Sequence, residues 1–139
     1  QARMAYDFVM MDSPAGLGEA FQLSSSCADR AIVVSTTDAS ALRDAQRTVG
    51  ELTRSMEHIH LVVNRVQPRL LRRLHTTIDD AMDTAGLPLL GVVPEDANVM
   101  LAANRGQPLI LATNRGAAVA YLNIARRVLG QRVPLMRIH

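Results

Sequence analysis

A short apolar run near the start of the chain ends in a carboxylate that is followed by a turn. Residues 6–12 are mostly apolar and end in Asp12, and residues 13–16 are serine, proline, alanine and glycine. An acid at the end of a strand lies at the carboxyl edge of a sheet, where open α/β folds bind ligands, and it can hold Mg²⁺ through water. The turn after it would lie near a terminal phosphate. A lone acid here is equally typical of a cap or turn, so both interpretations stay open.

Composition excludes several kinds of chemistry. All 15 basic residues are arginine, so no Schiff base, phosphate-loop lysine or receiver-domain lysine is available. The single Cys27 excludes a disulfide framework and a cysteine-ligated metal cluster within the chain, and we expect it to be a small buried residue. A net charge of +2 and 3% aromatic residues give little support for nucleic-acid binding, so a nucleic-acid partner is not expected.

Apolar runs alternate with amphipathic stretches along the chain. The runs lack polar alternation, which is typical of strands buried on both faces of a parallel sheet. The longer stretches carry apolar residues at helical spacing. We therefore expect one domain over residues 1–139, an α/β fold with an open, mainly parallel sheet and flanking helices. The expected strands are residues 6–12, 31–36, 59–64 and 87–94, and the expected helices are 40–56, 68–85, 96–103 and 117–129, with a short helix within 18–27.

The segment 6–16 resembles the Walker B and switch II region of MinD-type ATPases, which belong to the deviant-Walker group that also includes ParA. The similarity covers nearly the whole chain, but only the C-terminal half of such a protein. It implies the C-terminal part of a P-loop NTPase fold, which is Rossmann-like. Further matching segments follow in the family's order at residues 28–37, 40–47, 61–65, 90–96, 103–108 and 124–127.

The resemblance implies a nucleotide site, and one part of it, the phosphate side, would consist of Asp12 and the turn of residues 13–16. Asp12 would be the Walker B acid that positions the water shell of Mg²⁺. The turn after it would sense the γ-phosphate and move when ATP becomes ADP. That turn consists of Ser13, Pro14, Ala15 and Gly16.

The resemblance also implies a base side. Asn64 would hydrogen-bond the adenine ring, because its amide has both a donor and an acceptor. Arg65 follows it as in the family and would lie against the base or pair locally. Pro94, Glu95 and Asp96 would form the loop that flanks the adenine.

A third set of residues matches a partner-binding face of the family. The helix expected at 40–56 resembles the face used for Min-type regulator proteins near the dimer interface. Arg43, Asp44 and Arg47 match that motif, whereas Gln46 replaces an acid of the family pattern. Partner binding through this helix is therefore expected at three of the motif's positions.

The chain also departs from the family outside this helix, and the family's first switch region, with its water-positioning acid, has no counterpart in it. The glycine-rich phosphate loop with its lysine is absent, and residues 134–139 have no amphipathic membrane-binding pattern. ATP and Mg²⁺ are the cofactors implied for the full-length protein, which would cycle between an ATP-bound dimer and an ADP-bound monomer. We expect this chain alone to bind neither and to be inactive. The implied location is cytoplasmic, with peripheral inner-membrane association through a tail that this chain lacks.

Alternative interpretations come from other classes of protein. One is a ParA-type partition or flagellar-number ATPase, and another is a non-catalytic regulatory module of the same fold. The basic group of Arg69, Arg72, Arg73 and His75, expected on one helix with the acidic residues 79–83, is either a patch for an anionic partner or a solvated face. Because half of a doubly wound sheet would leave an open strand edge, we also expect the chain to self-associate.

Overall fold

A parallel sheet of three strands forms the centre of the molecule in the computed structural model, which describes residues 2–14 and 16–136. The strand order is β1-β2-β3, so β2 is hydrogen-bonded on both sides. Ala31 pairs with Ile59 at one junction, and Leu61 pairs with Leu89 at the other. The fold class expected from the sequence is therefore confirmed. The strands are β1 (Ala31–Ser35), β2 (Ile59–Val66) and β3 (Leu89–Pro94).

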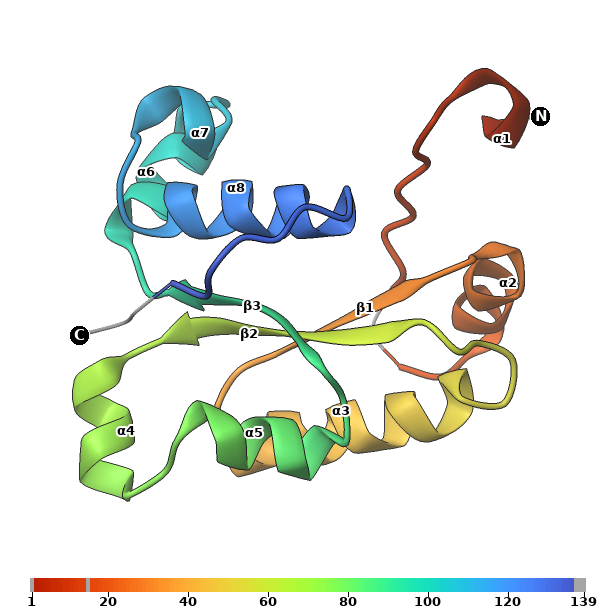
Figure 1. Ribbon diagram of the computed structural model, residues 1–139, viewed down its shortest axis with the longest axis horizontal. Coiled ribbons are helices and arrows are strands. Elements are labelled where there is room, and N and C mark those ends of the chain that lie inside the picture. Colours follow the sequence, from red (N-terminus) through yellow and green to blue (C-terminus); the bar gives the residue numbers. More distant parts are fainter. Residues whose placement is uncertain (1, 15, 137–139) are drawn as a thin grey trace.

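Helices cover both faces of this sheet (Figure 1). On one face lie α3 and α5, and on the other α8 packs against β3. The helices are α1 (Ala2–Ala5), α2 (Glu19–Cys27), α3 (Ala39–Leu52), α4 (Pro68–Leu74), α5 (Ile78–Ala85), α6 (Ala97–Asn104), α7 (Leu109–Ala112) and α8 (Ala117–Val128).

Successive side chains of β2 point to opposite faces of the sheet, so the strand contributes to a hydrophobic core on each face. Leu61 and Val63 are fully buried on the face that meets α3 and α5, while Val62 points to the face that meets α8. Burying a leucine or valine side chain contributes about 1.5–3 kcal/mol relative to leaving it in water. The α8 side also depends on small residues, since a side chain on Gly91 of β3 would overlap Ile124 of α8.

The segment expected as a first strand, residues 6–12, is not a strand in this structure. It runs as an irregular stretch in which Met10 is 77% exposed and Tyr6 is 69% exposed. A strand requires a neighbour that takes its backbone hydrogen bonds. Among residues 2–14 and 16–136 no strand pairs with this segment, so its apolar composition does not produce a strand.

The single helix expected over 68–85 is also wrong, because the chain breaks into α4 and α5. His75 adopts a left-handed conformation with φ 51°, and Thr77 starts α5 with a capping box that uses Asp80. The capping box provides hydrogen bonds to N–H groups that a continuous helix would have used internally. The basic residues of α4 and the acidic residues of α5 therefore lie on separate helices.

Other boundaries agree with the sequence to within a few residues. Two short helices were not expected, namely α1 and α7, and the second begins directly after Pro108. Cys27, expected to be buried, is exposed at the end of α2. In the part of the chain that the structure describes, no helix has the length and apolar character needed to cross a bilayer.

Candidate nucleotide-binding edge of the sheet

The residues expected to read a base lie at one edge of the sheet. Asn64 and Arg65 are near the carboxyl end of β2, and Pro94 closes β3. Pro94 is in register with Val66, and the N–H of Glu95 donates to the carbonyl of Val66 at 3.0 Å. Because the two strands are parallel and adjacent, the structure brings these residues together as expected from the sequence.

The backbone at Arg65 takes an unusual conformation. Its φ is 54°, in the left-handed region that non-glycine residues rarely adopt. In this conformation its N–H donates to Oδ1 of Asn64 at 2.9 Å. The register of β2 against β3 shifts between Val63 and Val66, so the strand is irregular at the pair. The amide of Asn64 is therefore tied to the backbone beside it.

Glu95 connects the two strand ends. Nη2 of Arg65 lies 3.2 Å from one of its carboxylate oxygens, and Nε2 of Gln67 donates to the other. The hydrogen bond from Gln67, and after it that from Arg65, holds the pKa of Glu95 below its usual value. Gln67 was not among the residues expected at this site. Its position could have indicated it, because Gln67 comes three residues after Asn64, directly after the end of β2.

Asp96 is engaged in holding the fold. Its Oδ1 accepts from the N–H of Asn98 at 2.9 Å and caps α6, while Oδ2 accepts from the N–H of Ala117 at 3.0 Å at the start of α8. These backbone hydrogen bonds hold the pKa of Asp96 below its usual value. Gly116 has φ 56° and lies so close to Asp96 that a side chain there would overlap the carboxylate. A role beside adenine stays a prediction for this residue.

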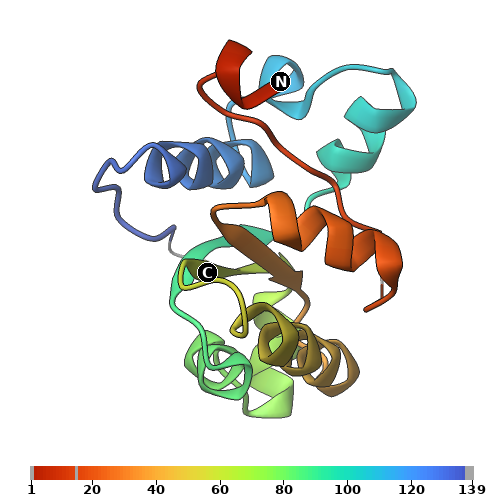
Figure 2. The ribbon, with the colours of Figure 1, turned by 90° about the vertical axis from the view of Figure 1, so that its right-hand side faces the viewer.

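The residues expected at the phosphate side lie elsewhere. Asp12, Pro14 and Gly16 are exposed, and Ser13 accepts a hydrogen bond from Ser24 of α2 at 3.1 Å. Ala15 lies outside the described residues. The segment runs beside α2, away from the carboxyl ends of β2 and β3 (Figures 1 and 2). The structure thus separates the two sides of the expected site, because the segment has no sheet partner to place it at that edge.

Asp12 does not form a magnesium site with its neighbours. Magnesium is usually held by one or two carboxylates together with waters and substrate phosphates. In the described ranges no group of three histidine, cysteine or acidic side chains is placed to bind a metal. A role for Asp12 in the water shell of the ion stays a prediction.

The expected partner-binding residues share one exposed surface of α3. Asp44 and Arg47 are more than 70% exposed and form an ion pair of 3.7 Å, and Arg43 is exposed beside them. The opposite side of the helix buries Leu42 and Ala45 in the core. Exposed ion pairs of this kind contribute little to stability, so the surface charges of α3 are available to a partner.

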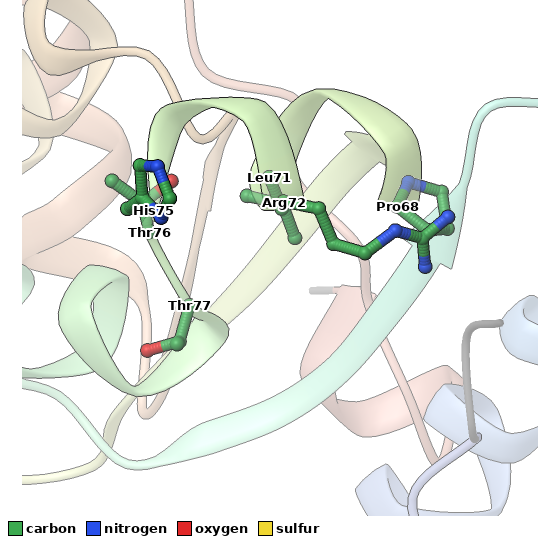
Figure 3. Close-up of a pocket in the computed structure, with 6 residues that line it drawn as sticks. All are labelled: Pro68, Leu71, Arg72, His75, Thr76 and Thr77. Carbon is green, nitrogen blue, oxygen red and sulfur yellow. The ribbon is translucent and has the colours of Figure 1, made fainter.

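An open hollow of about 540 Å³ lies where α4 turns into α5 (Figure 3). None of the residues expected at the nucleotide site or the partner face lines it. The arginine Arg72 extends along its edge, and the hollow is shallow and open to solvent. It is lined by Pro68, Leu71, Arg72, His75, Thr76 and Thr77.

A parallel three-stranded sheet with helices on both faces matches the P-loop NTPase fold of the MinD and ParA kind. No protein-family model matches the chain. It is 40% identical over 138 residues to the septum site-determining protein MinD of Bacillus subtilis, a match that covers 97% of this chain and 52% of that protein. The chain is accordingly similar to the C-terminal portion of MinD-type proteins.

Solved structures agree with this assignment. Those of MinD from Aquifex aeolicus, alone and in a MinC:MinD complex, match with TM-scores of 0.89 and 0.88 at 33% identity, covering 95% of this chain and 57% and 55% of those chains. MinD from Pyrococcus horikoshii, complexed with Mg-ADP, matches with a TM-score of 0.78 at 28% identity, covering 88% of this chain and 50% of that one. The chain thus spans about half the length of the curated relatives and solved structures that it matches.

Proposed function

We propose that this chain supplies the base-recognising side of the nucleotide site in a MinD-like ATPase, an ATP-dependent dimerisation switch in the selection of the cell-division site. One observation carries the proposal: the ion pair between Arg65 and Glu95 joins the two strand ends that hold the expected base-side residues. The matched relatives are septum site-determining proteins, which favours this role over a ParA-type partition function.

Each part of the chain has a separate task in this proposal. Asn64 hydrogen-bonds adenine, with Pro94 and the loop after it beside the ring. Asp12 and the turn that follows it serve the phosphates and magnesium, which would supply charge stabilisation when bound. In the present structure that segment is apart from the base side, so the proposal requires it to be placed by strand pairing that the described residues do not provide.

The chain alone is proposed to lack ATPase activity. A phosphate loop stabilises the transferred phosphoryl group with backbone N–H groups and a lysine, and this sequence has no lysine. We expect hydrolysis of ATP by the purified chain to stay below about 10⁻³ s⁻¹, the order of intrinsic rates in unassisted nucleotide switches. A faster rate that is lost with Asp12→Ala would contradict this.

A Min-type regulator is the proposed partner of α3. The MinD of one matched structure was solved in complex with MinC. The exposed charges of Arg43, Asp44 and Arg47 are the groups that we propose to contact such a regulator. Charge reversal at Arg43 and Arg47 should weaken binding of the cognate regulator, whereas reversal at Arg54, on the turn after α3, should not.

Binding of nucleosides tests the base side directly, because a nucleoside requires no phosphate loop. In contrast to the expectation from the sequence that the chain alone binds no ATP, the proposed base side predicts weak binding through the base. In titrations followed by NMR, adenosine should shift the amide signals at the ends of β2 and β3. Asn64→Ala should weaken this binding about tenfold or more, the scale expected when a bidentate base contact is lost. Asn114→Ala, which removes an exposed amide from a loop, is the matched control. Equal binding by the Asn64→Ala variant and the unmodified chain would contradict the proposed function.

A further inference from the structure

One hydrogen bond orients the side-chain amide of Asn64. Its Oδ1 accepts the backbone N–H of Arg65 at 2.9 Å. If the amide turned over, its NH₂ group would face that N–H, and two donors would then oppose each other with no acceptor between them. The backbone therefore selects one of the two orientations, with Oδ1 toward Arg65 and the NH₂ group free to donate elsewhere.

The orientation of an asparagine amide decides which purine it recognises at a given base position. Adenine presents a donor at its exocyclic amino group and an acceptor at the ring nitrogen beside it. Guanine presents an acceptor at its exocyclic oxygen and a donor at the corresponding ring nitrogen. The two bases therefore require opposite orientations of the same amide, and an amide that cannot turn over accepts one and rejects the other.

The N–H of Arg65 is itself held in place by side chains. A φ of 54° is unfavourable for an arginine, so the surrounding contacts must maintain it. The guanidinium of Arg65 and the amide of Gln67 both donate to the carboxylate of Glu95 across the gap between the strand ends. The N–H of Glu95 is bonded in turn to the carbonyl of Val66, which ties the loop back to β2.

We infer that Glu95, acting through Arg65, is a positioning residue that fixes the amide of Asn64 for adenine and against guanine. The inference rests on the proposed function, in which Asn64 reads the base. It adds a determinant of specificity that does not itself touch the nucleotide. When the contacts of Glu95 with Arg65 and Gln67 are lost, Asn64 is still present but its amide can turn over. The preference for adenosine over guanosine should therefore fall more than the affinity for adenosine.

The test compares adenosine with guanosine as ligands of the same chain. Dissociation constants from NMR titrations should favour adenosine over guanosine by about tenfold or more in the unmodified chain. In Glu95→Ala, and in Arg65→Gly, which removes the guanidinium but still permits a positive φ, this ratio should fall about fivefold or more. Glu95→Gln keeps one acceptor oxygen for the two donors and should retain part of the preference. Glu57→Ala removes an exposed carboxylate just before the amino end of β2 and should leave the ratio unchanged.

The possible outcomes separate this inference from the function on which it rests. An unchanged ratio in Glu95→Ala and Arg65→Gly, with adenosine still preferred, would overturn the inference and leave the proposed function intact. Equal loss of affinity for both nucleosides would show a merely structural role and also overturn it. If the unmodified chain bound neither nucleoside, or both equally, the proposed function would fail and the inference with it.

Discussion

A single carboxylate links the ends of two helices that are distant in the sequence. Asp96 caps α6 through the N–H of Asn98 and reaches the N–H of Ala117 at the start of α8. Backbone N–H groups in the first turn of a helix have no partner inside the helix, so a side chain that accepts from two helices stabilises both. Asp96 therefore controls how the loop after β3 is held.

Replacement of Asp96 by alanine should destabilise the fold. Two helix starts lose their acceptor, and the N–H of Ala117, on a buried residue, is left without a partner. The expected loss is about 1–3 kcal/mol in the free energy of unfolding, measured by urea denaturation. Asp83→Ala, on the exposed side of α5, is the control and should change stability by about 0.5 kcal/mol or less. Equal effects of the two variants would refute the bridging role.

The same carboxylate predicts a dependence of stability on acid. The pKa of Asp96 in the folded chain lies below its ordinary value of 3.8, so near that pH the unfolded chain binds more protons. Its stabilisation is thus complete above the ordinary value and is lost as the pH falls through the folded value. The difference in free energy of unfolding between the unmodified chain and Asp96→Asn should be constant near neutrality and should shrink below about pH 4. A constant difference down to about pH 2.5 would contradict this.

For single residues, the sequence predicts where a residue lies in the fold better than it predicts which hydrogen bonds its side chain makes. That Asn64 and Pro94 lie at the same edge of the sheet follows from two adjacent parallel strands ending there. The hydrogen bonds of Glu95 to Gln67 and of Asp96 to Ala117 depend on the local register and on the path of α8. No spacing of residues along the chain predicts these two hydrogen bonds, so they are found only in the folded structure.

Among the elements, α8 approaches β3 closely because Gly91 has no side chain. An alanine there would overlap Cγ1 and Cδ1 of Ile124. Gly91→Ala should therefore cost about 1–3 kcal/mol in the free energy of unfolding, as overpacked cores do. Gly50→Ala, in α3 where nothing lies near the added methyl group, should instead stabilise by about 0.5–1 kcal/mol.

A double variant separates steric overlap from other causes. If the clash with Ile124 explains the loss, Ile124→Ala should cost less in the Gly91→Ala background than alone, since the smaller side chain makes room for the new methyl group. Strictly additive effects in chemical denaturation would rule out a direct clash between the two positions.

The two elements that the sequence predicts incorrectly have separate physical reasons. Residues 6–12 have the composition of a strand, but composition does not supply the neighbouring strand that completes its hydrogen bonds. Residues 68–85 have a helical pattern throughout, yet the capping box at Thr77 and the left-handed His75 interrupt it. The capping box and the left-handed turn both involve polar residues, and a prediction based on the spacing of apolar residues does not detect them.

For the whole molecule, β1 and β3 are the two edge strands of the sheet in the described ranges, and β1 is the less buried of the two. It pairs with β2 alone among the strands of the described ranges, and Val34 on it is 60% exposed. An open edge of this kind can pair with another chain. We therefore propose self-association through β1, which should appear as a mass that rises with protein concentration in light scattering.

A charge on that strand should reduce the association. Val34→Lys puts a charge beside the open edge, a substitution that opposes edge-to-edge pairing. Leu129→Lys, at the end of α8, introduces the same charge on a side chain of similar exposure and should have little effect. A monomer at every concentration, or equal weakening by both variants, would contradict association through β1.

The central position of β2 also determines the order in which backbone amides of the chain become exposed to solvent by local unfolding. Its amides are bonded on both sides and its side chains at Leu61 and Val63 are fully shielded, so they should exchange with deuterium last, whereas the amides of residues 6–14 should exchange first. Asn64 follows directly after Val63, the last residue of β2 that pairs with both neighbouring strands. The strand that carries it should thus stay formed through most local openings of the chain, during which the segment of Asp12 opens and closes many times.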